Sequence, residues 1–148
     1  VRDASDESIA KFSEKIIRDG KTDFLAAVFH EPDGAGHHFG WGSPEYVKAM
    51  QVLDDHLAKL IRAIEEKGFK DNTVVVIASD HGGTEKKHGG PTLREMERTL
   101  VVWGKGVKEN YELKTSTASY DVGATLAALL DLRFPQAWIG RPILEAFK

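Results

Sequence analysis

Two segments of this chain carry apolar residues at intervals of three and four, which is the spacing of an amphipathic helix. The first segment begins at Ser5 or Asp6, either of which can cap a helix, and it ends at Gly20. The second begins with Ser43 as its N-cap and ends at Gly68. We therefore predict two amphipathic helices. The apolar positions expected to be buried are Ile9, Phe12, Ile16 and Ile17 in the first, and Val47, Met50, Leu53, Leu57, Leu60, Ile61 and Ile64 in the second.

Three continuous apolar runs have the length of β-strands, and they lie at residues 23–30, 73–79 and 99–103. The first run is nearly all apolar, which is typical of a strand covered on both faces of a sheet. The long helix joins the first two runs, so these three elements predict a right-handed crossover between parallel strands. A further helix is expected from Ser119 to Leu130, and a last turn at residues 143–147. This alternation predicts an α/β fold with a mainly parallel sheet.

Composition and charge favour a single domain over residues 1–148. Of the 148 residues, 41% are hydrophobic and 29% are charged, which is ordinary for a globular domain. The net charge of -3 offers no basic surface for a nucleic acid, and no apolar stretch approaches the ~20 residues of a membrane helix. The absence of cysteine excludes disulfides and thiolate zinc sites, so any zinc would be bound by His and Asp. These patterns leave the cellular compartment open.

Polar side chains with metal-binding chemistry follow the second apolar run. Asp80 and His81 come directly after it, His88 is seven positions beyond His81, and glycines surround all three. Carboxylate oxygen and imidazole nitrogen are ligands that divalent cations accept, and glycine lets the backbone approach an ion closely. Taken alone, the pair fits two interpretations equally well. One is a metal site, and the other is an ordinary turn in which Asp80 caps a helix and His81 is a surface histidine. Together with His88 and the glycines, they predict a hydrolytic metal site.

A second polar cluster follows the first apolar run. Asp33 and His37 are four positions apart, a spacing that on a helix would place them on one face. The proline and the two glycines at residues 32–36 predict a loop instead. Taken alone, Asp33 fits a turn residue and His37 a solvated histidine, and the adjacent His38 is an alternative ligand. Because ligands of open α/β sheets bind beyond the carboxyl ends of the strands, we expect both clusters to face one site.

Four segments of the chain together form a recognisable pattern. They are Glu31-Pro32-Asp33-x-x-x-His37, Ser79-Asp80-His81-Gly82-Gly83, Lys87-His88-Gly89-Gly90, and Tyr120-Asp121-Val122-Gly123-Ala124-Thr125-Leu126-Ala127-Ala128-Leu129-Leu130 followed by Trp138-Ile139-Gly140-Arg141-Pro142. In type and order they resemble the alkaline phosphatase superfamily, and most closely its type I phosphodiesterase and nucleotide pyrophosphatase branch. The resemblance implies an alkaline phosphatase-like three-layer α/β/α sandwich, of which this chain would be the C-terminal part.

The resemblance also implies a role for each candidate ligand. Asp33, His37 and His88 would bind one divalent ion, and Asp80 and His81 would bind a second. Both ions would be zinc, with manganese as the alternative, in a two-metal hydrolysis of phosphate esters. In this family a Ser or Thr nucleophile and a further Asp stand in an N-terminal half, and this chain has no counterpart to them. We therefore expect no catalytic nucleophile here, and an isolated chain that is inactive without the missing N-terminal half of a larger catalytic domain.

Other functions stay open on the sequence alone. The expected substrate is a small-molecule phosphate ester, but sulfatases, phosphonate hydrolases and metal-dependent phosphomutases share the same metal residues. A catalytically inert metal-binding or interaction domain is the alternative from a different class. The residues upstream of this chain would discriminate between the two classes, because the enzyme needs a Ser or Thr nucleophile and a separate Asp, each following a strand.

Overall fold

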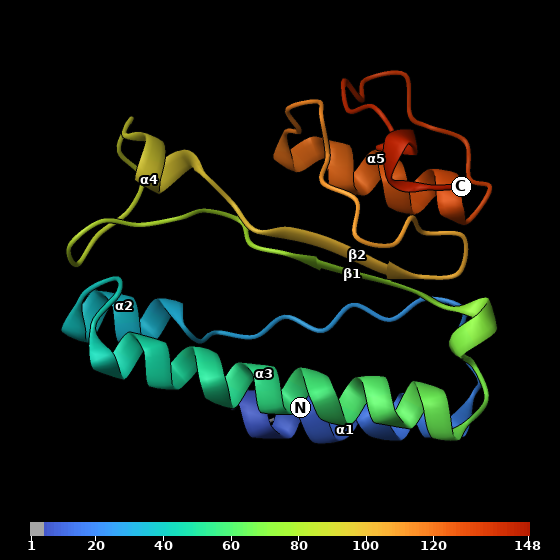
Figure 1. Ribbon diagram of the computed structural model, residues 1–148, viewed down its shortest axis with the longest axis horizontal. Helices are drawn as coiled ribbons and strands as arrows, with labels where there is room; N and C mark the ends of the chain where they lie inside the picture. Colours follow the sequence, from blue (N-terminus) through green and yellow to red (C-terminus); the bar gives the residue numbers. More distant parts are fainter. Residues whose placement is uncertain (1–4) are drawn as a thin grey trace. The chain divides into compact units, whose positions relative to one another are not determined.

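The computed structural model describes residues 5–148, which divide into two compact units. The first unit contains residues 5–71 and 81–97, and the second contains residues 72–80 and 98–148. The helices of the first unit, labelled in Figure 1, are α1 (Asp6–Asp19), α2 (Asp33–Phe39), α3 (Pro44–Glu66) and α4 (Leu93–Met96). The second unit contains the strands β1 (Val74–Ala78) and β2 (Leu100–Gly104), the helix α5 (Ser119–Leu129) and a short 3-10 helix (Leu144–Ala146). Another 3-10 helix, Lys70–Asn72, precedes β1.

Local capping signals set the ends of the two long helices. The Ser5 hydroxyl accepts a backbone N–H of the first turn of α1 at 3.4 Å, and Gly20 ends this helix in the left-handed region, at φ 63°. The Ser43 hydroxyl accepts a backbone N–H of the first turn of α3 at 3.2 Å. Both predicted helices are therefore confirmed, with Ser5, Gly20 and Ser43 as the capping residues that the sequence indicates, while α3 ends at Glu66, two residues before the predicted Gly68.

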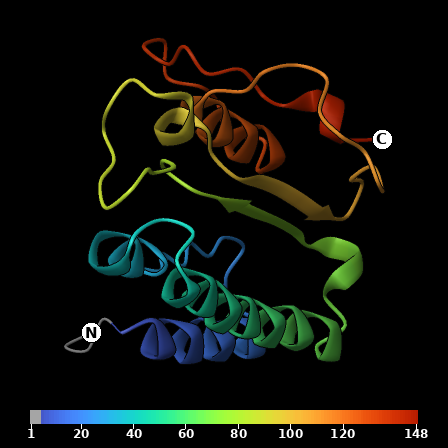
Figure 2. The same ribbon diagram turned by 60° about the vertical axis from the view of Figure 1, so that its left-hand side comes forward.

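The helices α1 and α3 lie side by side and run in the same direction (Figures 1 and 2). Ala10 of α1 and Leu60, Ala63 and Ile64 of α3 are buried in the core of the first unit. Two helices packed in this way cover only the strip of each that faces the other. Four apolar positions predicted to be buried are consequently exposed, namely Phe12, Ile16, Val47 and Met50. No helix in the described range combines the length and the apolar character that a membrane crossing requires.

Residues 23–30 are extended, but they form no strand within the described part of the chain. Leu25, Ala27 and Phe29 are half-buried and the residues between them are exposed, which is the alternation of a strand with one covered face. Phe29 stacks on the ring of His56 in α3, with ring centroids 6.2 Å apart. The prediction of a paired strand is wrong here. A ladder needs a neighbouring strand, and the described residues supply none to this segment.

The strands β1 and β2 form a two-stranded antiparallel sheet, in which Val74 faces Gly104 and Ala78 faces Leu100. This finding corrects the predicted parallel crossover. Residues 23–30 do not pair, and the chain returns from β1 through residues 79–99 to enter β2 in the opposite direction. Both strands lie within one residue of the predicted apolar runs, and the α/β class is confirmed.

Carboxylates organise the loops of the second unit. The Asp121 carboxylate accepts the N–H of Ala118 at 2.7 Å, at the start of α5, and the N–H of Arg141 at 2.8 Å. The Glu145 carboxylate accepts the N–H of Lys114 at 3.1 Å. Each of these side chains ties together segments that are about 20 to 30 residues apart in the sequence, so the loops around α5 are held by polar contacts.

Candidate metal centre

The helix α2 presents Asp33 and His37 on the same face, one turn apart. The prediction of a loop at these residues is wrong. Pro32, at the N-cap, makes no side-chain capping bond, but the Glu31 carboxylate accepts a backbone N–H of the first turn at 2.9 Å and satisfies it. Gly34 leaves room for this contact, since a Cβ there would lie 2.9 Å from a carboxylate oxygen of Glu31. Glycine is a weak helix former, which is why the local pattern does not indicate the helix.

A tight hairpin brings His81 and His88 together. Thr84 and Lys87 exchange two backbone hydrogen bonds of 3.0 Å each, and Glu85 takes the left-handed conformation between them, at φ 51°. The chain therefore turns back on itself, and the rings of His81 and His88 stack with their centroids 3.6 Å apart. This turn explains how two histidines seven positions apart in the sequence reach the same place.

Asp33 of α2 faces both histidines of the hairpin. Its Oδ1 atom lies 3.8 Å from Nε2 of His81 and 3.8 Å from Nε2 of His88. Its Oδ2 atom lies 3.6 Å from Nε2 of His37. Asp33, His81 and His88 each offer one ligand atom within 4.8 Å of the others. Three imidazole nitrogens thus surround a single carboxylate.

Backbone carbonyls hold two of these rings in a defined orientation. Nδ1 of His37 lies 3.0 Å from the carbonyl oxygen of Lys86, and Nδ1 of His81 lies 2.8 Å from that of Gly82. Since a carbonyl only accepts, Nδ1 of each neutral ring must carry the proton and donate it. Nε2 then carries the lone pair that can ligate a cation. In both rings, Nε2 is the nitrogen that faces Asp33.

The donor set fits a divalent cation. Oδ1 of Asp33 is buried and has no hydrogen-bond partner among the described residues, an arrangement that costs free energy unless a ligand satisfies it. Ligand atoms about 2.0–2.2 Å from one zinc ion lie roughly 3.3–3.6 Å apart at tetrahedral angles. The 3.8 Å separations from Asp33 to His81 and His88 are only slightly longer. Small movements of the side chains would therefore let these three residues share one ion.

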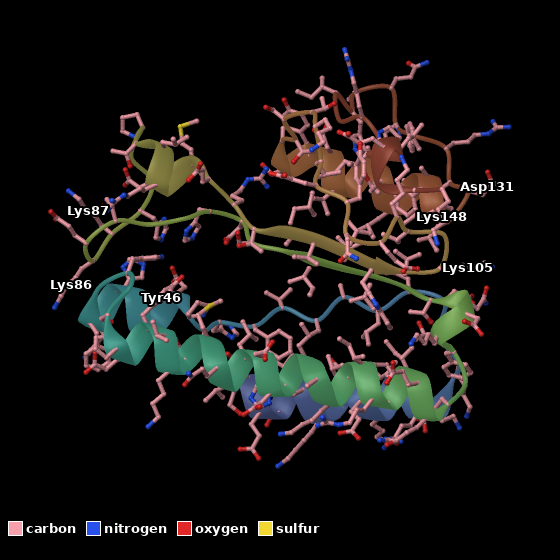
Figure 3. All side chains as sticks on the ribbon, in the orientation of Figure 1. Tyr46, Lys86, Lys87, Lys105, Asp131 and Lys148 are labelled. Carbon is pink, nitrogen blue, oxygen red and sulfur yellow. The ribbon has the colours of Figure 1, made fainter. Side chains whose placement is uncertain are left out.

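Donor groups accompany the cluster in the first unit. Burial raises the pKa of the Tyr46 hydroxyl, and the negative charge of Asp33 raises this pKa further, so the hydroxyl stays protonated. Lys86 and Lys87 of the hairpin lie at the same end of the unit as Tyr46 (Figure 3). A protonated hydroxyl and ammonium groups are hydrogen-bond donors, which suits an anionic ligand beside a cation.

The set of predicted ligands that lies close together in the structure is not the set that was predicted to share an ion. His81 lies with Asp33 and His88, whereas the sequence pattern groups it with Asp80. Asp80 itself belongs to the second unit, two residues after β1. Its role as a ligand therefore stays a prediction, and so does the assignment of the five residues to two ions.

The structure places His37, and not its neighbour His38, beside Asp33. Both histidines are exposed, but the His38 ring contacts that of Phe39, with centroids 5.3 Å apart. His37 faces Asp33 and also contacts the His88 ring, at a centroid distance of 5.0 Å. One turn of helix separates His37 from Asp33, and the adjacent position points elsewhere.

Two residues outside the predicted ligand set also shape the cluster. Glu95 is buried and its carboxylate accepts the N–H of Gly90 at 2.9 Å. Thr92 stands three positions before it, and this Thr-x-x-Glu spacing is a helix-start pattern that could have identified Glu95. Trp41 contacts the rings of two candidate ligands. No local sequence signal marks Trp41, because its contacts depend on the hairpin.

Comparison with known proteins places the chain in a family. The family model of type I phosphodiesterase / nucleotide pyrophosphatase matches residues 1–127. A 2,3-bisphosphoglycerate-independent phosphoglycerate mutase from Chloroflexus aggregans is 29% identical over 139 residues, covering 88% of this chain and 24% of the mutase. Venom phosphodiesterase 2 from Crotalus adamanteus is 32% identical over 65 residues, covering 44% of this chain and 8% of that protein.

The comparison of structures agrees with the comparison of sequences. A crystal structure of Ps i-CgsB superposes with a TM-score of 0.71 at 19% identity, covering 96% of this chain and 38% of that one. At this identity the likeness shows the fold alone, and the fold is alkaline phosphatase-like. The chain spans less than half the length of each of these three proteins. Because the family model accounts for residues 1–127, this chain belongs to the type I phosphodiesterase / nucleotide pyrophosphatase family, within the alkaline phosphatase superfamily.

Proposed function

We propose that this chain is the metal-binding part of an enzyme that hydrolyses phosphate esters. The observation that carries the proposal is the convergence of three histidine Nε2 atoms on the carboxylate of Asp33, one oxygen of which is buried and accepts no hydrogen bond in the part of the chain that the structure describes. Histidine and aspartate are the donors that catalytic zinc sites use, and bound zinc would supply charge stabilisation for phosphoryl transfer. Phosphoryl-transfer chemistry is also what the family and its mutase relative support.

Each side chain has a distinct task in this proposal. Asp33, His81 and His88, with His37 beside them, hold the cation. The backbone carbonyls that accept from Nδ1 keep two of the rings in the orientation that ligation requires. Tyr46 keeps a protonated hydroxyl that can donate to a phosphate oxygen.

A second cation is part of the proposal, and Asp80 is its expected ligand by the resemblance to the family. Two ions about 3.5–4 Å apart can stabilise both the attacking and the leaving oxygen of an in-line displacement. The nucleophile and the remaining ligands would come from the rest of a longer parent protein, since the chain covers only 24% of the mutase and 8% of the venom phosphodiesterase.

A phosphomutase is the second candidate function. The alignment with the mutase covers 88% of this chain, whereas that with the venom phosphodiesterase covers 44%. The two reactions share the metal centre and differ in the acceptor, which is water in a hydrolase and another hydroxyl group in a mutase. The metal ligands do not discriminate between these acceptors, but the products do.

Calorimetric titration with zinc tests the metal centre. We expect one zinc ion per chain to bind more tightly than any second, because the first unit supplies several ligands to one place. Asp33→Asn and His88→Ala are expected to weaken binding by more than the ~10–100-fold cost of losing a residue that only orients a ligand. His38→Ala, which changes an exposed neighbour, serves as the matched control. Equal zinc affinities in wild type and Asp33→Asn would contradict the proposed centre.

Turnover of p-nitrophenyl phosphate and of bis(p-nitrophenyl) phosphate tests the reaction. The longer parent protein is expected to release nitrophenol, and the same protein with His88→Ala is expected to lose this activity. The isolated chain should be close to the blank with zinc alone, because the proposal assigns the nucleophile to the rest of the parent protein. Turnover by the isolated chain at ~1 s⁻¹ or more would contradict the assignment of the nucleophile to another part of the parent protein. Transfer of the phosphoryl group to an added sugar phosphate in place of water would favour the mutase.

A further inference from the structure

Trp41 lies against two glycines, one from each segment that carries candidate ligands. A Cβ atom on Gly36 of α2 would lie 2.8 to 2.9 Å from the indole atoms Cε2, Cδ2 and Cζ2. A Cβ atom on Gly83 of the hairpin would overlap the same ring, at Cε2, Cδ2 and Nε1. The indole therefore fills the space between the backbone of α2 and the backbone of the hairpin.

The two glycines are needed for space and not for an unusual backbone conformation. Neither Gly36 nor Gly83 has φ in the left-handed region, so alanine suits the backbone at both positions. At both positions the three atoms nearest to an added Cβ all belong to Trp41. Removal of the indole would therefore relieve the clash that an alanine creates.

Trp41 makes further contacts with both segments. Its backbone N–H donates to the carbonyl oxygen of Glu85, at the turn of the hairpin, at 2.7 Å. Its ring meets the His37 ring edge-on, with centroids 5.2 Å apart and an interplanar angle of 83°. It meets the His88 ring with centroids 6.0 Å apart and an angle of 72°. A single residue thus contacts one candidate ligand on each segment.

We propose that Trp41 is a positioning residue whose indole sets the distance between α2 and the hairpin. The inference rests on the proposed metal centre, because this distance decides whether Asp33 of one segment and His88 of the other can share an ion. Ligands must be held to within about 0.5 Å of their productive positions. A rigid ring packed directly against backbone on two sides resists movement on that scale. Trp41 supplies no ligand atom itself, since the indole nitrogen only donates.

A double-mutant cycle between Trp41 and Gly83 tests the inference. Zinc affinity is measured by calorimetry, and thermal unfolding of the metal-free protein is measured in parallel, for the wild type, Trp41→Ala, Gly83→Ala and the double variant. Each single substitution is expected to weaken zinc binding about 10-fold or more, as for other residues that orient metal ligands. The double variant is expected to bind zinc more tightly, and to unfold at a higher temperature, than Gly83→Ala alone, because the overlap with the indole is gone.

Further variants keep the test decisive if Trp41→Ala is poorly folded. Trp41→Phe keeps a smaller aromatic ring between the glycines and is expected to retain most of the zinc affinity. A second double-mutant cycle, of Gly36→Ala with Trp41→Phe, tests the contact between the aromatic ring and α2. Trp138→Ala is the matched control, since Trp138 is half exposed in the second unit and a Cβ atom on the nearby Gly123 would lie at an ordinary 3.8 to 3.9 Å from its ring. It should leave zinc affinity unchanged.

The outcomes separate this inference from the proposed function. Additive effects of Trp41→Ala and Gly83→Ala on both zinc affinity and unfolding temperature would overturn the spacing role. A folded Trp41→Ala protein with the zinc affinity of the wild type would overturn it as well. If the wild type binds no zinc, the proposed metal centre fails, and the unfolding temperatures of the metal-free variants decide the spacing role. Rescue of Gly83→Ala by Trp41→Ala then supports it, and additivity overturns it.

Discussion

The Glu95 carboxylate accepts the backbone N–H of Gly90 at 2.9 Å, and so holds the outgoing arm of the hairpin two residues after His88. Glu95 is only 6% exposed, and its other oxygen accepts the hydroxyl of Thr92 at 2.5 Å. Its backbone carbonyl accepts the N–H of Gly82, on the incoming arm, at 3.0 Å. One residue of α4 therefore anchors both arms of the hairpin that carries the two stacked histidines.

Glu95→Gln is expected to weaken zinc binding without removing a ligand. The hydrogen bonds from the Thr92 hydroxyl and the Gly90 N–H lower the pKa of Glu95, so the side chain is a carboxylate at neutral pH. A glutamine accepts at only one of its two terminal atoms, so one of these bonds is lost and the hairpin is held less firmly. We expect a loss of about 10-fold in zinc affinity by calorimetry. Glu97→Gln, at an exposed position of the same segment, is the control. An unchanged affinity in Glu95→Gln would show that the hairpin needs no anchor from α4.

Asp6→Asn is expected to destabilise the connection that leads into α2. The two carboxylate oxygens of Asp6 accept the N–H groups of His30 at 2.8 Å and Glu31 at 2.9 Å. The amide of asparagine would lose one of these exposed hydrogen bonds, at a cost of about 0.5–1.5 kcal/mol in the free energy of unfolding, because water can reach the released donor. Urea unfolding measures this change. Glu7→Gln removes only an exposed ion pair with Lys11 and should have little effect. Identical midpoints for Asp6→Asn and the wild type would refute the prediction.

Acid is expected to destabilise the second unit through Asp121. The N–H groups of Ala118 and Arg141 donate to its carboxylate and lower its pKa below the ordinary value of 3.8. A carboxyl group with a lowered pKa contributes stability that is fully present above the ordinary value and is lost as the pH falls through the folded-state pKa. Asp121→Asn should therefore lower stability at neutral pH and flatten the acid limb of a plot of unfolding temperature against pH. Asp131→Asn, at an exposed position, should keep the acid limb of the wild type. An acid limb that is the same in Asp121→Asn as in the wild type would count against this role.

Short-range signals in the sequence determined the helix ends and the donor chemistry. Ser5 and Ser43 cap the two long helices and Gly20 closes the first, because capping involves only residues within one turn. The family could also be identified from the sequence, because each of its motifs is a short contiguous segment and the family model matches residues 1–127. The candidate ligands could be identified from residue type, because the ability of an imidazole or a carboxylate to ligate a cation is a property of the side chain itself.

Pairing and packing decided the elements that the local pattern predicted wrongly. Residues 23–30 have the composition of a buried strand, but a strand forms only where a neighbour accepts its backbone hydrogen bonds. The direction of the β1–β2 pair likewise depends on the path of residues 79–99. Residues 33–39 are helical despite their glycines, because the Glu31 carboxylate satisfies the first turn.

The tertiary structure alone brought His81 beside Asp33 and placed Trp41 between Gly36 and Gly83. A spacing of seven residues in the sequence is compatible with many separations in space, and the paired hydrogen bonds of Thr84 and Lys87 select the one that stacks two histidines. The sequence by itself determined which groups can bind a cation, since that property belongs to each side chain. Their distances were decided by contacts between segments far apart in the chain, because a ligand set is shaped by the close packing of the backbone that carries it.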